Sequence, residues 1–266
     1  MTARAASQRS HSEAQGRRAT RFHVLGVGVD RVTIEQAAEQ VIRYARGGAT
    51  RHVVTVNPEF VVTARRHAAF RRVLCHADLA TADGMGIIWA ARILGDRLPE
   101  RVGGVELLER IAAKAAASGS SLFLLGAAEG VAAEAADALR ARYPRLLVAG
   151  TYAGSPRAAE ADGIIERIRD ARPAILFVAF GAPAQDLWIA TYRARLDVPV
   201  AMGVGGAFDY LAGRAARAPR LIQRTGFEWL YRLIRQPWRW RRMLALPRFG
   251  GMVIATRILG LLCRRP

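Results

Sequence analysis

Apolar and polar positions follow two different periods along most of the chain. Short apolar runs rich in valine predict strands at residues 22–29, 52–56, 79–81, 121–125, 146–150, 174–180 and 198–204. Longer segments with apolar residues three or four positions apart predict helices at residues 34–46, 58–69, 86–94, 105–118, 130–142, 158–172 and 184–196. Because strands and helices alternate, the pattern favours βα units built around a parallel sheet.

Local signals support several of these boundaries. Thr33 followed by Gln36 has the spacing of a capping box at the start of a helix. Pro144 and Pro173 stand where a helix must end before the next strand begins. We therefore predict one α/β domain over residues 22–212, with a Rossmann-like parallel sheet flanked by helices.

Residues 213–266 have a different character. They contain no strand-like run, and Phe227, Leu230 and Ile234 fall at helical spacing. Residues 249–263 are about 15 mostly apolar positions interrupted by one arginine, which is too short to span a bilayer and is typical of an interfacial helix. We predict a C-terminal helical basic appendage over 213–266.

The formal net charge is +18, and most of it lies at the two ends of the chain. Residues 1–21 carry +4, and residues 214–266 carry +12 from thirteen arginines and one glutamate, so the body is nearly neutral. A basic tail on a neutral body points toward the phosphates of nucleic acid or of anionic lipid. Residues 1–21 lack the apolar core of a secretory signal and indicate a flexible basic segment. The two distant cysteines favour a reducing compartment, and we expect a cytoplasmic protein.

Polar side chains follow two of the predicted strands, at the edge of the sheet where ligands bind. Thr55 and Asn57 present small polar groups at one strand tip, although Asn57 also suits a helix N-cap. Asp83 lies between a strand and a Gly-x-Gly turn. Its carboxylate is either a helix cap or a general base, and the second role requires a substrate hydroxyl within hydrogen-bond reach.

Glycine turns follow three other predicted strands. Gly126 begins a turn into a helix, whose N-terminus would favour a diphosphate, and Gly205 and Gly206 form another such turn. Gln185 follows a third turn, where its amide can form paired hydrogen bonds with a base or a sugar. Structural glycines alone would give the same pattern. None of the five histidines is spaced for a metal ion and no Gly-x-Ser-x-Gly motif occurs, so neither metal hydrolysis nor serine-triad chemistry is expected.

Seven segments follow one another over about residues 23–243. They read TVNPEFVVTARR, ADLATADGMGIIWAARILG, LPERVGGVELL, LFLLGAAEGVAAEAA, FVAFGAPAQDLWI, GVGGAFDYLAGRAARAPR and GFEWLYRLIRQPWR. In this order they resemble the WecG/TagA/CpsF family of bacterial glycosyltransferases. Seven ordered motifs are far more specific than any one of them.

The resemblance implies an inverting transfer of a sugar similar to N-acetylmannosamine from a UDP-sugar to an undecaprenyl-diphosphate-linked sugar, without a bound metal or other cofactor. Asp83 matches the family's proposed general base. Thr55 and Asn57 match positions lining the same pocket, Arg101 matches the arginine of the LPERV segment, and Gln185 matches the glutamine after the GxPxQ turn. An inverting transfer also needs one base and a positive environment for the departing diphosphate, which agrees with this assignment.

The resemblance also gives the appendage a role. The family's basic C-terminal segment is expected to close over the site and to meet an anionic membrane and the acceptor diphosphate. The matching arginines are Arg214, Arg217, Arg220 and Arg224. Ala184 departs from the family, in which many relatives carry a basic residue there, and the tail beyond about Arg248 is not covered. We expect a peripheral location on the inner face of the plasma membrane, and exposed apolar residues also allow a homo-oligomer.

Three alternatives are kept open at this point. A relative of the same family could transfer a uronic acid in exopolysaccharide synthesis. A nucleotide-dependent oxidoreductase would share the fold, but the segment from Gly26 to Arg31 lacks the rest of a dinucleotide fingerprint. Nucleic-acid binding by the Trp/Arg segment at 238–242 would not explain the function of the nearly neutral body. Nucleic acid is therefore not expected as a partner.

Overall fold

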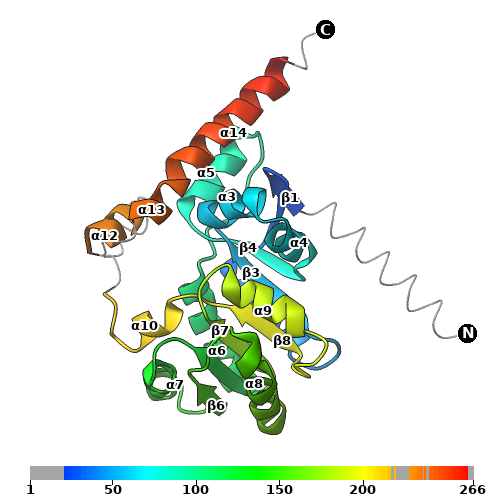
Figure 1. The fold of residues 1–266 in the computed structure, drawn as a ribbon, viewed down its shortest axis with the longest axis vertical. Helices are drawn as coiled ribbons and strands as arrows, with labels where there is room; N and C mark the ends of the chain where they lie inside the picture. Colours follow the sequence, from blue (N-terminus) through cyan, green and yellow to red (C-terminus); the bar gives the residue numbers. More distant parts are fainter. Residues whose placement is uncertain (1–20, 217–218, 220–227, 236, 238–239, 263–266) are drawn as a thin grey trace, which may run out of the picture.

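Six parallel strands form the central sheet, in the order β4-β3-β8-β7-β5-β6 (Figure 1). The strands are β3 (Arg51–Val56), β4 (Leu79–Ala82), β5 (Leu122–Gly126), β6 (Val148–Tyr152), β7 (Ile175–Ala179) and β8 (Val200–Gly203). The predicted parallel α/β sheet is confirmed. The computed structural model describes residues 21–216, 219, 228–235, 237 and 240–262.

Helices connect the strands. They are α2 (Ile34–Tyr44), α3 (Pro58–Arg66), α4 (Ala68–His76), α5 (Met85–Ile93), α6 (Gly104–Ser118), α7 (Val131–Arg142), α8 (Ala158–Ala171), α9 (Ala184–Tyr192) and α10 (Ala207–Leu211). The predicted capping box is present, because the Thr33 hydroxyl accepts from the Gln36 amide while the Gln36 side chain accepts from Thr33 N–H. Helices α7 and α8 end before Pro144 and Pro173, as predicted.

Both faces of the sheet are covered, which explains why its strands read as continuous apolar runs. In β5, Leu122 and Leu124 pack in one cluster with α2, α6, α7 and α10, whereas Phe123 and Leu125 pack in another with α8 and α9. Successive side chains of a strand point to opposite faces, so each strand supplies both layers of the core. This packing holds the carboxyl ends of the strands in fixed relative positions.

The single strand predicted at 22–29 is wrong. The segment is an antiparallel hairpin of β1 (Arg21–Val24) and β2 (Val27–Asp30), separate from the main sheet. Leu25 and Gly26 both adopt positive φ, at 50° and 85°, and so reverse the chain between the two halves of the apolar run. The carboxylate of Asp30 accepts hydrogen bonds from Arg21 and from the backbone of Ala80, which ties the hairpin to β4.

The single helix predicted at 58–69 is also wrong, because the chain forms α3 and α4 with a break at His67. His67 has an extended backbone, with φ −126° and ψ 92°, and its Nδ1 accepts from the Phe70 amide at 3.2 Å. A histidine therefore caps the second helix, a role usually filled by Ser, Thr, Asp or Asn. The apolar period continues across this break and conceals it in the sequence.

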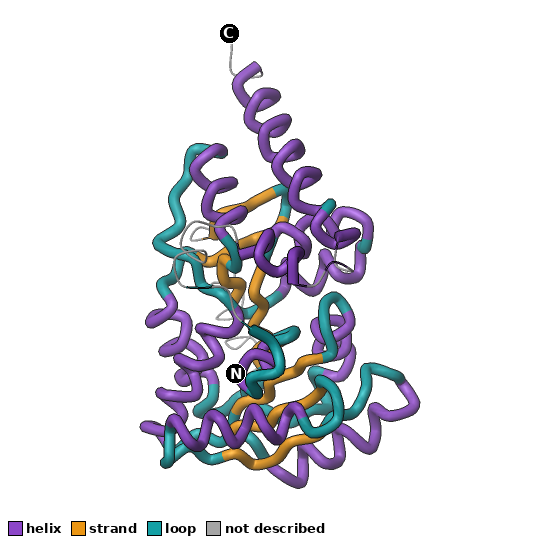
Figure 2. Tube along the Cα trace, turned by 90° about the vertical axis from the view of Figure 1, so that its left-hand side faces the viewer, coloured by secondary structure: helices purple, strands orange, loops and turns teal. Residues whose placement is uncertain are grey.

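The described part of the appendage is helical, as predicted. It comprises α12 (Glu228–Arg235), α13 (Trp240–Met243) and α14 (Ala245–Leu262). Ala245, Phe249 and Val253 of α14 are buried at intervals of four residues in one cluster with α3, α4 and α5. Beyond this stripe α14 projects past the body (Figure 1, Figure 2). Within the described segments of the chain, no helix is both long and apolar enough to cross a membrane.

Candidate active site

A cavity of about 1140 Å³ lies at the carboxyl edge of the sheet, between the body and the appendage. Residues that end or follow four different strands line it: Thr55 near the end of β3, Asp83 after β4, Phe180 after β7 and Gly205 after β8. In open parallel sheets this edge is where ligands bind, because the loops there converge. The structure therefore brings together side chains that are far apart in the sequence.

Asp83 occupies the loop between β4 and α5. Its backbone amide donates to the Val56 carbonyl at 2.8 Å, which fixes the loop against the end of β3. The Asp83 side chain is 27% exposed and so remains reachable by a substrate in the cavity. Arg101 Nη1 lies 3.9 Å from Asp83 Oδ1. Two of the side chains singled out in the sequence are thus neighbours.

Glu106 is a site residue that the sequence did not single out. It lies in the first turn of α6, lines the cavity and forms a hydrogen-bonded ion pair with Arg101. A Cβ at Gly103 would lie 2.7 Å from Arg101 Nη1 and 3.2 Å from Asp83 Oδ1, and closer still to Glu106. Any larger residue at Gly103 would therefore displace the ends of these three side chains. The available signal was an acidic residue in the first turn of the helix that follows the LPERV segment.

Thr55 and Asn57 stand at the tip of β3, and both line the cavity. Thr55 is 7% exposed. Asn57 is the N-cap of α3, where its side-chain oxygen accepts from the Phe60 amide at 2.9 Å. The cap uses the carbonyl side of the amide group, so capping and a place in the cavity wall are compatible. Both interpretations of Asn57 from the sequence hold at once.

Gln185 is buried in the cavity wall and supports the neighbouring glycine turn. Its Oε1 accepts from the Gly205 amide at 2.9 Å, and Gly205 and Gly206 also line the cavity. A Cβ at Gly203 would lie 2.5 Å from Gln185 Nε2, so only a glycine allows this approach. The side-chain oxygen of Gln185 thus shapes the turn that faces the cavity.

A buried pair of titratable groups stands next to Gln185. Asp186 at the start of α9 is fully buried, and its Oδ1 lies 3.4 Å from Nε2 of His52 in β3, which is itself 2% exposed. Neither side chain is among the residues lining the cavity. The sequence did not single out this pair, because the two residues belong to different elements and match no motif.

Two predicted groups lie elsewhere. Gly126 is not among the residues that line the cavity, and a Cβ there would lie 2.8 Å from the Ala179 carbonyl carbon, so close packing of β5 against β7 requires glycine. Arg214 pairs with Glu134 of α7, and its hydrogen bond holds the pKa of the Glu134 carboxyl below its usual value. Arg217, Arg220 and Arg224 lie outside the described residues.

The appendage supplies much of the apolar lining of the cavity, and Trp89 and Ile93 of α5 add to it. The side chains that it contributes are those of Trp229, Leu233, Trp240, Met243, Leu244, Leu246, Pro247, Phe249 and Val253. Arg242 of α13 pairs with Glu59 of α3 at 2.7 Å, so an ion pair joins the appendage to the body across the cavity wall. Apart from Arg242, the charged and amide side chains named above thus come from the body, whereas the apolar part of the lining comes largely from the appendage together with Trp89 and Ile93 of α5.

Among the described residues there is no cluster of three or more His, Cys, Asp or Glu side chains that could hold a metal ion. The lining of the cavity includes two arginines, Arg101 and Arg242, and the Gly205–Gly206 turn.

A parallel α/β sheet with a carboxylate, an arginine and glycine turns beside a cavity at its carboxyl edge has the layout of an α/β enzyme. The model of the glycosyl transferase WecG/TagA/CpsF family matches residues 22–261. The chain therefore belongs to this family and is a glycosyltransferase.

Curated relatives cover most of the chain. A protein of Bacillus spizizenii named N-acetylglucosaminyldiphosphoundecaprenol N-acetyl-beta-D-mannosaminyltransferase is 34% identical over 202 residues, 76% of this chain and 78% of its own length. A protein of the same name from Staphylococcus aureus is 32% identical over 228 residues, 85% of this chain and 89% of its own length. A third, from Bacillus subtilis, is 32% identical over 202 residues.

Proposed function

We propose that this glycosyltransferase moves a sugar similar to N-acetylmannosamine from a UDP-sugar to an undecaprenyl-diphosphate-linked sugar, with inversion at the anomeric carbon. The product would enter cell-surface polysaccharide or teichoic acid synthesis. The names of the relatives support the donor and the acceptor, because those proteins are N-acetylmannosaminyltransferases acting on an undecaprenol-linked N-acetylglucosamine.

The two-sided cavity is the observation that carries this proposal. Its polar wall suits the sugars and the diphosphates, which need hydrogen-bond donors and positive charge. Its hydrocarbon wall, formed by the appendage together with Trp89 and Ile93 of α5, suits the first isoprenoid units of a lipid-linked acceptor. A soluble acceptor would gain little from a wall that carries two tryptophans and several leucines.

In the reaction, Asp83 takes the proton of the acceptor hydroxyl while that oxygen attacks C1 of the donor sugar. The C1–O bond to the diphosphate breaks on the opposite face, and its electron pair leaves with UDP. The Arg101 and Glu106 pair fixes the position of this base, because Arg101 lies between the two carboxylates. In the Gly205–Gly206 turn, the Gly206 amide would face the departing diphosphate and stabilise its negative charge, while the Gly205 amide donates to Gln185.

The appendage would hold the enzyme on an anionic membrane surface, where the acceptor resides. Basic residues near such a surface contribute about 1 kcal/mol each, so a few arginines suffice for reversible binding. Exposed Trp240, Ile234 and Leu259 would add apolar contact at the interface. The described part of the appendage contains helices and no strand, and these helices expose apolar side chains. Both features fit that role.

The test is UDP release with a panel of UDP-sugars and a short-chain prenyl-diphosphate-linked N-acetylglucosamine. We expect rapid release with UDP-N-acetylmannosamine, dependent on the acceptor, and slow release with UDP-N-acetylglucosamine, its C2 epimer. Preference for UDP-glucuronate would favour the exopolysaccharide alternative. Equal release with and without acceptor, or no release from any donor, would contradict the proposal.

A further inference from the structure

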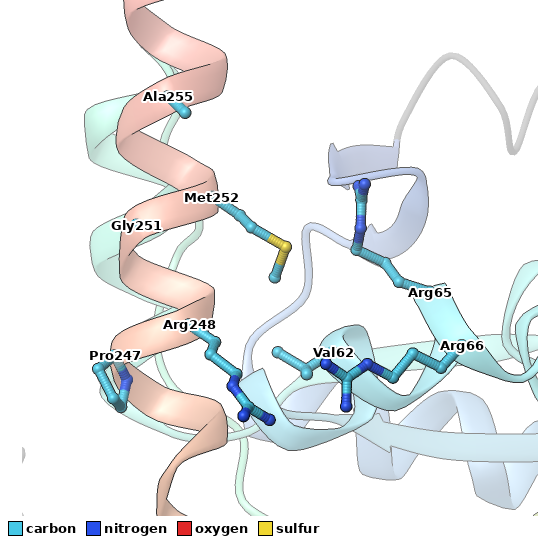
Figure 3. A pocket seen from close by; sticks show the side chains of 8 residues that line it. All are labelled: Val62, Arg65, Arg66, Pro247, Arg248, Gly251, Met252 and Ala255. Carbon is cyan, nitrogen blue, oxygen red and sulfur yellow. The ribbon is translucent and has the colours of Figure 1, made fainter.

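A second hollow lies outside the catalytic cavity, between α3 and α14, with a volume of about 580 Å³. Figure 3 shows Arg66 extending from α3 toward Arg248 of α14, with Met252 pointing from α14 into the space between the helices. We refer to it as the α3–α14 groove. It is lined by Val62, Arg65, Arg66, Pro247, Arg248, Gly251, Met252 and Ala255.

Three arginines line this groove, and Figure 3 shows Arg66 and Arg248 approaching one another while Arg65 points away from them. Arg65, Arg66 and Arg248 are exposed, and within the described residues none of them forms an ion pair or a hydrogen bond. Glu59, the acidic residue of α3, is already engaged by Arg242. Like charges gathered in this way repel one another, and a bound anion would remove that repulsion.

Helix electrostatics account for only two of these arginines. Arg65 and Arg66 lie in the last turn of α3, where positive charge is favourable because the helix dipole is negative there. Arg248 lies in the first turn of α14, where positive charge is unfavourable. The helix dipole therefore does not explain the position of Arg248.

The rest of the groove is apolar. Val62, Pro247, Met252 and Ala255 form its lining together with one glycine. The apolar surface continues along α14 in exposed side chains, namely Ile254, Ile258, Leu259 and Leu261. A free phosphate ion would make no use of such a lining, and the groove offers no aromatic ring on which a nucleic-acid base could stack.

We propose that the α3–α14 groove binds one anionic phospholipid of the bilayer. The arginines hold its phosphate through their paired N–H donors, and the first carbons of an acyl chain lie on Met252 and Ala255. This inference deepens the membrane association proposed above and rests on it. It adds a defined lipid site, which α3 of the body and α14 of the appendage form together.

The site would also connect the membrane to the catalytic cavity. Pro247 lines both hollows, and α14 supplies Phe249 and Val253 to the wall of the cavity. A lipid that bridges Arg66 of α3 and Arg248 of α14 would add to the contact that α14 already makes with the body through Phe249 and Val253.

The experiment compares binding of the full chain to vesicles of phosphatidylcholine alone and to vesicles with about one quarter phosphatidylglycerol, by co-sedimentation. Wild type is expected to prefer the anionic vesicles. The double variant Arg66→Gln with Arg248→Gln should weaken this binding about tenfold or more, since each arginine contributes strongly at the surface. The matched control is Arg145→Gln with Arg169→Gln, which removes the same charge from the other end of the molecule, near α7 and α8 (Figure 1), and should change binding less than twofold.

A failure of membrane association as a whole can be distinguished from a failure of the groove alone. If wild type does not bind anionic vesicles, the membrane association and the groove both fail. If wild type binds and the two double variants weaken binding equally, the groove fails alone, and only net charge matters. If the groove variant instead raises KM for the short-chain acceptor about tenfold in the absence of vesicles, the groove holds the acceptor and the bilayer assignment is overturned.

A second pair of variants tests the groove with an added charge. Ala255→Glu places a carboxylate in the groove, whereas Thr256→Glu adds the same charge to the next residue of α14, which does not line it. Both residues are exposed, so both variants should fold. Ala255→Glu is expected to weaken binding to anionic vesicles severalfold more than Thr256→Glu. Equal effects would overturn the proposal.

Discussion

The body buries most of its apolar side chains, whereas the appendage leaves many of its own exposed. Strands β5 and β7 are buried over their whole length. Helix α14 buries one stripe, while Ile254, Ile258, Leu259 and Leu261 on its other faces are 50–60% exposed. Burial of apolar surface is the main favourable term in folding, so the body is stabilised by its own core. The appendage keeps apolar surface that the described part of the chain does not cover.

The same difference divides the catalytic cavity. The body contributes carboxylates, an arginine and glycine turns, each held by hydrogen bonds to neighbouring elements, as Gln185 holds Gly205. The appendage contributes mainly hydrocarbon and one ion pair, between Arg242 and Glu59. The chemistry therefore rests on the rigid part, and contact with an apolar partner rests on the part with uncovered surface. The following substitutions are expected to affect the body or the appendage separately.

The largest expected effect is on chemistry in the body. Asp83→Asn should lower turnover about 10²–10⁴-fold, because the acceptor hydroxyl loses its base. Vesicle binding should stay at the wild-type level, because the appendage is untouched. UDP release measures the first quantity and co-sedimentation the second.

Two controls accompany this change. Asp162→Asn, an exposed residue of α8, should leave turnover as it is. Asp209→Asn removes another carboxylate from the cavity lining, and it should have a smaller effect than Asp83→Asn. A larger loss for Asp209→Asn would move the base to that residue.

The next effect concerns how firmly α14 is docked. Phe249 is 4% exposed in the cluster beneath α14, and truncation of a buried phenylalanine costs about 3–5 kcal/mol. Phe249→Ala should therefore raise amide hydrogen exchange over residues 245–262 while β5 and β7 keep their protection. Ile258→Ala, on the exposed face, should change neither. Faster exchange in β5 as well would show that body and appendage unfold as one unit.

A smaller effect is expected inside the body. Gln185→Ala leaves the partly buried Gly205 amide without its acceptor and should lower the free energy of unfolding by about 1–3 kcal/mol. Urea denaturation gives this value directly. Gln40→Ala, at a partly exposed position of α2, should change it by less than about 0.5 kcal/mol. A Gln185 variant as stable as wild type would remove its supporting role.

The smallest effect is expected for Arg214→Gln. Its partner Glu134 is exposed, and exposed pairs contribute little. Because the hydrogen bond from Arg214 lowers the pKa of Glu134, the pair contributes above the ordinary pKa of a glutamate and is lost as the pH falls through the lowered value. The difference in Tm between variant and wild type should therefore be small at neutral pH and vanish in acid. A difference that grows on acidification would contradict this assignment.

Much of the fold could be predicted from the sequence, because periods and caps are local. The main strands and most helices follow from apolar spacing, and Thr33, Pro144 and Pro173 mark helix ends as expected. The errors arose where one apolar run contains a reversal, at Leu25 and Gly26, or a break, at His67. A periodic pattern does not report a change of direction when its apolar residues remain in register.

The sequence by itself determined that Thr55, Asn57 and Asp83 share one edge of the sheet, since parallel strands place their carboxyl ends together. The place of Asp83 as the base stays a prediction. Tertiary structure alone decided the order of the strands, the pairing of Arg101 with Glu106, the burial of His52 beside Asp186, and the meeting of Arg66 with Arg248 in one groove. Those neighbours are chosen by packing between distant segments, and no local period encodes them.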